Sequence, residues 1–168
     1  WKSLRRQVRV RGPVKIVSTN AVPLIAAERV IYTVNGVRTS FSEMMALPNS
    51  QLNTTYWLPW YNNVDLDTQL RIGNVSGSTA TVHVYIGDVE MLGSPFTLAT
   101  SSVGQSTRVS FAGINGGPVK IVSNVPIVAA GRASCRIRGV VPRLTEVVAV
   151  PINKNKTTYW QPRYNNVD

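Results

Sequence analysis

An internal repeat is the feature of this sequence that most restricts its fold. Segment 12–18, Gly-Pro-Val-Lys-Ile-Val-Ser, returns unchanged as 117–123, and residues 28–65 align without a gap to 131–168 with 16 identities in 38 positions. The repeating unit is therefore roughly 103–105 residues long, a usual size for one β-domain. Its middle stretch, 66–116, occurs once, so the chain holds about one and a half units.

The unit is built from short segments in which apolar and polar residues alternate, the period-2 pattern of half-buried strands. Strands are expected at 66–72, 80–86, 95–98, 106–111, 119–122 and 127–130, with Asn124 and Pro126 separating the last two. In the first copy, residues 26–34 form a further strand, and Asn35-Gly36 signals a hairpin turn. These strands and turns predict an all-β chain with an immunoglobulin-like sandwich.

One segment favours a helix. In 40–47, Ser40 and Glu43 form a capping-box pattern, and Pro48 follows as a stop signal. We expect one or two helical turns there.

The repeat divides the chain into three predicted parts. Residues 1–54 are the late half of an incomplete sandwich unit, 55–150 a complete unit, and 151–168 a tail that contains the first strand of a further unit. Half a sandwich leaves a sheet edge with unpaired backbone groups. This predicts that the tail of one copy adds a strand to the N-terminal unit of the next.

Because donor and acceptor lie at opposite ends, such a contact is heterologous and builds an open filament unless a ring closes. The predicted partner is therefore another copy of the same chain, in a homopolymer. The residues expected at this assembly interface are Tyr159, Trp160, Tyr164, Asn165, Asn166 and Val167.

The aromatic motif Tyr-Trp-x-Pro-x-Tyr-Asn-Asn-Val-Asp, which occurs at 56–65 and again at 159–168, allows a second function, a carbohydrate-binding or adhesion module. Flat rings suit the apolar faces of sugars, and amides suit their hydroxyl groups; the candidate residues are Trp57, Trp60, Tyr61, Asn62 and Asn63. The structural interpretation makes the motif a linker and first strand with an Asn-Asn turn. It is favoured because Trp60 becomes Arg163 in the second copy.

The net charge of +10 belongs to the two ends of the chain. Residues 1–20 hold six basic residues and no acidic one, and 132–168 hold seven basic against two acidic residues. Nucleic-acid binding is thus a rival function, which predicts strong salt dependence. No nucleic-acid fold signature accompanies the charge.

No catalytic or cofactor site is expected, so the chain is predicted not to be an enzyme. The single cysteine, Cys135, excludes an internal disulfide framework and a Cys-based zinc site, and the single histidine, His83, lies in a strand pattern. A calcium site remains an alternative for Asp65, Asp67, Asp88 and Glu90, although their spacing resembles no known loop.

The sequence also bears on location. No run of about 18 apolar residues occurs, which excludes a membrane-spanning helix within this sequence. The missing initiating methionine predicts a processed product or part of a longer chain.

Three segments carry a resemblance to a known group of proteins: 61–74, 105–111 and 117–123. They resemble tandem repeats in large secreted proteins of filamentous, Chloroflexus-like bacteria, over about 12–130. The resemblance implies an extracellular, cell-surface location and a β-sandwich array, and it carries over no catalytic or ligand residue. The expected function is a non-enzymatic structural subunit of a surface filament or repeat array.

Overall fold

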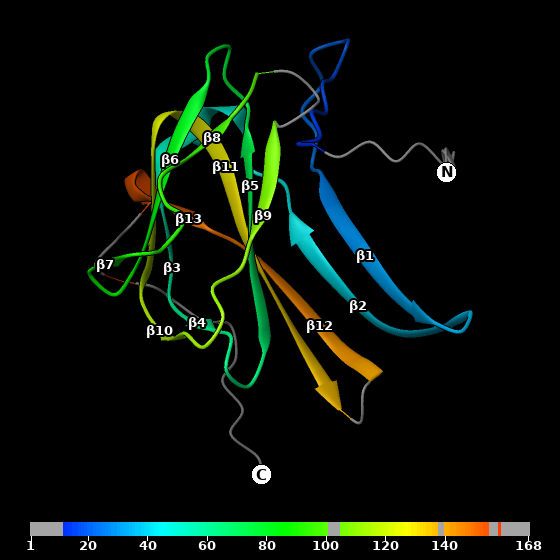
Figure 1. Cartoon of the computed structure of the whole chain (residues 1–168). Helices are drawn as coiled ribbons and strands as arrows, with labels where there is room; N and C mark the ends of the chain where they lie inside the picture. Colours follow the sequence, from blue (N-terminus) through cyan, green and yellow to red (C-terminus); the bar gives the residue numbers. More distant parts are fainter. Residues whose placement is uncertain (1–11, 101–104, 138–139, 155–157, 159–168) are drawn as a thin grey trace.

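The fold is an antiparallel β-sandwich flanked by a β-hairpin (Figure 1). The structure, a computed structural model, describes residues 12–100, 105–137, 140–154 and 158. Within these residues there are strands and two short 3₁₀ helices, η1 (Asn49–Gln51) and η2 (Ile152–Lys154), and no α-helix. The predicted all-β sandwich class is thereby confirmed.

The strands form two groups. The flanking hairpin consists of β1 (Ala27–Val34) and β2 (Val37–Met45). The sandwich contains β3 (Asn53–Leu58), β4 (Tyr61–Asn62), β5 (Asp67–Asn74), β6 (Ala80–Ile86), β7 (Val89–Glu90), β8 (Phe96–Leu98), β9 (Ser106–Val109), β10 (Asn115–Gly116), β11 (Val119–Ile137), β12 (Val140–Val148) and β13 (Val150–Pro151).

Strand β11 connects the two layers of the sandwich. Its first part, 119–123, pairs with β3 and β6, and its second part pairs with β5 over 127–134 and with β12 over 130–137. The register with β3 shifts between Val122 and Ile127. The two strands predicted at 119–122 and 127–130 are therefore one strand, and the predicted break at Asn124 and Pro126 marks the shift.

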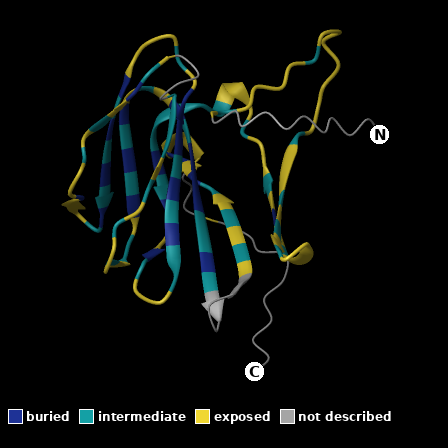
Figure 2. Ribbon diagram, turned by 45° about the vertical axis from the view of Figure 1, so that its right-hand side comes forward, coloured by how far each residue is buried: buried dark blue, intermediate teal, exposed yellow. Residues whose placement is uncertain are grey.

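The core lies between the layers, where buried positions alternate with partly exposed ones along β5 and β6 (Figure 2). It is filled by apolar side chains of both layers, including Leu70, Ile72, Val82, Val84, Val119, Ile121 and Ile127. Burial of one such side chain stabilises the fold by about 1.5–3 kcal/mol. The alternation that predicted these strands is thus the pattern of core contact.

The helix predicted at 40–47 is wrong, because residues 40–45 belong to strand β2 and the next two residues are not helical. Asn35 and Gly36 have φ angles of 49° and 80°, which suit the tight turn that folds β2 back onto β1. Val34 then pairs with Val37, and the ladder runs to Ala27 opposite Met45. Backbone pairing of β2 with β1 outweighs a local capping pattern.

The hairpin β1–β2 repeats the hairpin of β11 and β12. Arg29 lies opposite Glu43, as Arg132 lies opposite Glu146, and both pairs form salt bridges. Both ladders also carry an irregularity at the same place, after Tyr32 and after its equivalent Cys135. The sequence repeat is therefore a structural repeat over these residues.

Candidate assembly surface

The N-terminal segment 12–26 contains no strand, although it repeats the first part of β11. Val14, Ile16 and Leu24 are 85%, 60% and 58% exposed, whereas their equivalents Val119, Ile121 and Ile127 are 0% exposed. The same apolar residues thus form the core in one copy and lie in solvent in the other. This segment is the most prominent exposed apolar feature of the described chain.

The complete unit shows which strands cover such a segment. In β11, Ile121 lies opposite Tyr56 of β3 on one side and Val84 of β6 on the other. The tail repeats most of the sequence of β3, since 54–57 returns as 157–160 and Leu58 is replaced by Gln161. The chain therefore carries a second copy of the sequence of one of the two covering strands.

The six predicted interface residues, Tyr159, Trp160, Tyr164, Asn165, Asn166 and Val167, lie outside the described residues. Their equivalents in the complete unit are described, and they show the contacts that this sequence makes when it is paired with other strands. Those equivalents are Tyr56, Trp57, Tyr61, Asn62, Asn63 and Val64.

Tyr56, the equivalent of Tyr159, joins strand pairing to the core. Its ring is fully buried, and its hydroxyl donates to the carbonyl of Ile127 at 2.7 Å and accepts from the amide of Asn53 at 3.0 Å. Burial raises the pKa of the Tyr56 phenol, so the group stays protonated as a donor. The neighbouring Trp57 packs against Lys120, whose Nζ lies 5.6 Å from the ring centroid.

The residues of the proposed glycan platform do not form one exposed face. Tyr61 is fully buried; its hydroxyl donates to the carbonyl of Thr68 and accepts from the amide of Phe111. Asn62 is also buried, and its Oδ1 accepts from two amides of the following turn. Tyr61 and Asn62 thus have no free face for a sugar, and the role predicted for them is corrected to a structural one.

The other three platform residues are separated by their contacts. Trp57 lies over Lys120, and Trp60 is exposed and donates from Nε1 to Asn115 at 3.0 Å. Asn63 donates to Ser110 at 2.7 Å. The motif therefore acts mainly as a strand and turn.

A contact between the two hairpins was not predicted from the sequence. The amide of Leu144 donates to Ser40 Oγ at 3.0 Å, and the amide of Glu146 donates to Ser42 Oγ at 2.8 Å. Residue numbers rise together on both strands, so β2 and β12 run side by side in the same direction (Figure 1). Equivalent strands of the two copies thus stack almost in register.

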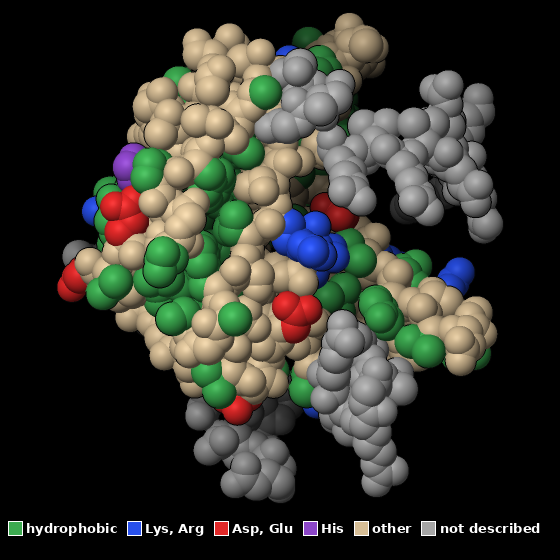
Figure 3. Space-filling model, in the orientation of Figure 1, with side chains coloured by type: hydrophobic (Ala, Val, Ile, Leu, Met, Phe, Trp, Pro, Cys, Tyr) green, Lys and Arg blue, Asp and Glu red, His purple; other side chains and the backbone are tan. Residues whose placement is uncertain are grey.

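Charged side chains lie buried or partly buried near this contact. Glu146 pairs with Arg132, and the pKa of Arg71 on β5 is lowered by burial and by the positive charges of Arg132 and Arg108. Figure 3 shows Lys and Arg side chains gathered on this side of the molecule. Arg71 Nε and Glu146 Oε2 are buried without a hydrogen-bond partner among the described residues.

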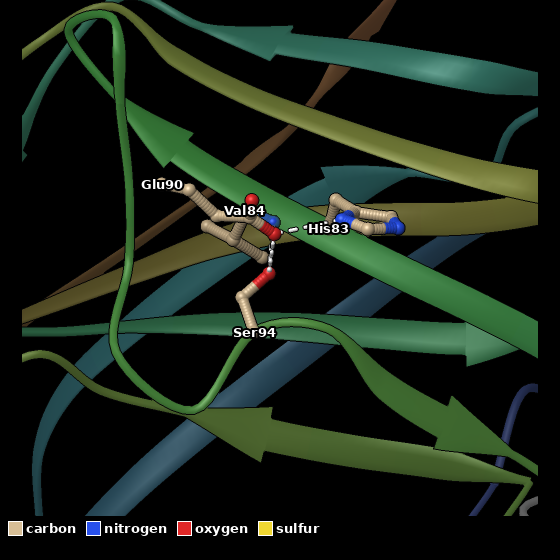
Figure 4. Close-up of polar contacts among 4 residues, drawn as sticks. All are labelled: His83, Val84, Glu90 and Ser94. Carbon is tan, nitrogen blue, oxygen red and sulfur yellow. Dashed lines mark hydrogen bonds and ion pairs between the residues drawn. The ribbon is translucent and has the colours of Figure 1, made fainter.

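The single histidine has a structural contact on the opposite layer (Figure 4). His83 Nδ1 lies 2.7 Å from Glu90 Oε1, and Ser94 donates to the same oxygen at 3.0 Å. The hydrogen bond from His83, followed by that from Ser94, lowers the pKa of Glu90. This group joins β6 to the β7 turn.

No metal site emerges from the described residues, in which no group of three or more His, Cys, Asp or Glu side chains could hold an ion. Asp65 and Asp67, considered for calcium, accept hydrogen bonds from Asn62 and Gln69. In the part of the chain that the structure describes, no helix has the length and apolarity needed to cross a membrane. Much of the basic ends, including 1–11, lies outside these residues.

Comparisons with known proteins add little. No protein-family model matches the chain, and no curated protein matches it. A crystal structure of Thermotoga maritima 1070 is similar over 59% of this chain and 94% of that one, with 15% sequence identity and a TM-score of 0.39. A likeness at this level says nothing about function.

Proposed function

We propose that this protein is a non-enzymatic structural subunit that assembles head to tail at the cell surface. In this assembly, the tail 157–168 of one copy adds a β-strand to segment 14–25 of the next. One observation carries the proposal: Val14, Ile16 and Leu24 are exposed, whereas their equivalents are fully buried. The extracellular location rests on the resemblance to secreted tandem repeats.

The complete unit supplies the register for this added strand. Ile121 opposes Tyr56 and Val119 opposes Leu58, so the equivalent pairs are Ile16 with Tyr159 and Val14 with Gln161 of another copy. Tyr159 then donates to the carbonyl of Leu24, as Tyr56 donates to that of Ile127. Main-chain hydrogen bonds provide the affinity, and alternate side chains fix the register.

The tail residues contribute unequally. Tyr159 and Trp160 repeat residues whose partners lie on β11, which segment 14–25 also repeats. Tyr164 and Asn166 repeat Tyr61 and Asn63, whose partners Thr68, Ser110 and Phe111 belong to the stretch that occurs once. The binding energy therefore comes mainly from 157–161.

Electron microscopy of negatively stained protein at micromolar concentration tests the assembly. The full chain is compared with a chain that ends at Lys154, which keeps β13 and its buried Pro151. Regular fibres are expected from the full chain and single particles from the truncated one. Polymers of the truncated chain, or single particles of the full chain, would contradict the proposal.

A glycan-binding function has less support. A sugar platform needs coplanar, exposed rings, and Tyr61 is fully buried. Glycan binding that is lost on Trp60→Ala substitution, together with a monodisperse full chain, would favour it over assembly.

A further inference from the structure

The contact between β2 and β12 joins equivalent strands of successive repeat units, so it shows how one unit stacks on the next. On the first hairpin, Ser40 and Ser42 accept hydrogen bonds from the second hairpin, and Met44 lies on the same face of the strand; Ser42 is buried, and Ser40 and Met44 are partly buried. On the second hairpin, Leu144, Glu146 and Val148 are covered to a similar degree. We call the face that carries Ser40, Ser42 and Met44 the back face of the first hairpin. We call the face that carries Leu144, Glu146 and Val148 the front face of the second hairpin.

Each hairpin also has a face that is equivalent, by the sequence repeat, to the contact face of the other hairpin. The front face of β1–β2 consists of Phe41, Glu43 and Met45, the equivalents of Leu144, Glu146 and Val148, and it is exposed. The back face of β11–β12 consists of Arg143, Thr145 and Val147, the equivalents of Ser40, Ser42 and Met44, and it is exposed as well. In each hairpin, one face is partly or fully buried and the opposite face is exposed.

The open front face has the character of an interface. Phe41 is 64% exposed, and Ile31 lies directly opposite it on β1, also exposed. Arg29 lies 5.8 Å from the Phe41 ring centroid and pairs with Glu43. A hollow in this region is lined by Arg29, Ile31, Arg38, Thr39, Ser40 and Phe41.

We infer that a second copy of this chain stacks its front face (Phe41, Glu43, Met45) on the back face (Arg143, Thr145, Val147) of the first. The contact repeats the one between β2 and β12, and this inference rests on the proposed head-to-tail assembly. The same stacking relation then runs through every unit of the polymer, within chains and between them.

The internal contact predicts the pairs that meet across copies. Ser42 accepts from the amide of Glu146, so its equivalent Thr145 accepts from the amide of Glu43 of the second copy. Ser40 corresponds to Arg143, whose side chain has no acceptor for the amide of Phe41 of the second copy. The Arg143 guanidinium instead packs on the Phe41 ring of that copy. Both pairs are heterologous, so the stack continues.

Disulfide trapping in the full chain tests this arrangement. In a Cys135→Ser background, Phe41→Cys and Arg143→Cys are made singly and together, and products of mild oxidation are separated on non-reducing gels. The double variant is expected to give a ladder, and a mixture of the single variants is expected to give a dimer. Each single variant alone is expected to stay monomeric.

Two control pairs test whether trapping requires the predicted contact between hairpins. Ser40→Cys with Leu144→Cys repeats the pair within one chain and is expected to close an intramolecular disulfide. Val89→Cys, on exposed β7 of the sandwich, is expected not to trap Arg143→Cys. Efficient trapping through Val89→Cys, or dimers of Phe41→Cys alone, would overturn the inference.

A Tyr159→Asp substitution separates this inference from the proposed strand addition. If fibres form, depend on Tyr159 and show no trapping between Phe41→Cys and Arg143→Cys, stacking is wrong and strand addition stands. If trapping persists in the Tyr159→Asp chain, stacking stands and strand addition is not what holds the copies together.

Discussion

At the residue scale, Tyr56 shows how one buried hydroxyl ties a strand to the core. It donates to the carbonyl of Ile127, which belongs to the part of β11 where the register shifts. It also accepts from the amide of Asn53, at the start of β3. Two backbone groups distant in sequence therefore depend on one side chain.

The Tyr56→Phe substitution should remove both hydrogen bonds while keeping the ring. Because two partly buried backbone groups lose their partner, the free energy of unfolding should fall by about 1–3 kcal/mol. Urea denaturation measures this. The Tyr32→Phe substitution removes a hydroxyl that has no hydrogen bond to the described residues, and it should change stability by less; equal effects would contradict this role of Tyr56.

The pair of His83 and Glu90 predicts a shift in titration. Because hydrogen bonding from His83 is the main cause of the lowered pKa of Glu90, His83→Ala should raise that pKa toward its ordinary value. Carboxyl-detected NMR titration measures the change. Ser94→Ala should shift it in the same direction by less, and an unchanged pKa in His83→Ala would rule out the contact as its cause.

The sign of the pH effect follows from the same pair. A carboxyl whose pKa is depressed in the folded state stabilises the fold above its unfolded pKa, and this contribution disappears as pH falls through the folded pKa. Acid therefore weakens the link between β6 and the β7 turn.

At the element scale, the hairpin β1–β2 is held by side-chain oxygens that receive the amides of β12. Ser42→Ala removes the acceptor for the amide of Glu146, so exchange of that amide with solvent should accelerate and stability should fall by about 0.5–1.5 kcal/mol. Hydrogen exchange followed by NMR measures this. Thr39→Ala, on exposed backbone of the same strand, serves as the control; equal exchange at Glu146 in both variants would contradict the stacking contact.

The elements that the sequence predicted well are those whose own residues determine them. Residues 80–86 alternate strictly between apolar and polar side chains, and β6 has these bounds. Asn35-Gly36 predicted its hairpin because both residues accept positive φ. The helix at 40–47 failed because pairing with β1 and contact with β12 outweigh a local capping pattern.

Strand β11 shows the same limit. Asn124 and Pro126 look like breakers, yet they lie where β11 does not pair with β3, so the missing amide of Pro126 removes no hydrogen bond to that strand. Asn124 instead accepts from the amide of Thr81 at 2.7 Å. No local pattern distinguishes such a shift from the end of a strand.

The candidate site was predictable only in part. The repeat predicted that residues 1–54 lack partner strands, but segments 12–18 and 117–123 are identical in sequence. Their exposure differs because only the second has β3 and β6 beside it. The stacking of β2 on β12 depends on Ser40 and Ser42, whose positions in the sequence carry no signal for it.

At the scale of the whole molecule, the described chain contains one sandwich with a buried core and two surfaces that expose apolar side chains. Segment 14–25 exposes residues that belong in a core, and the front face of β1–β2 exposes residues that are covered in the other copy. A monomer with these surfaces leaves apolar area in water, which favours association. In the proposed assembly another copy covers both surfaces, because the chain repeats the sequences of the segments that would cover them.

Amide hydrogen exchange of segment 14–25 tests strand addition most directly. The full chain at micromolar concentration is compared with the full chain carrying Tyr159→Asp, with the amides of β6 as an internal reference. Strand addition predicts slow exchange around Ile16 in the unmodified chain, and fast exchange there in the variant with β6 unchanged. Fast exchange around Ile16 in both chains would contradict the account.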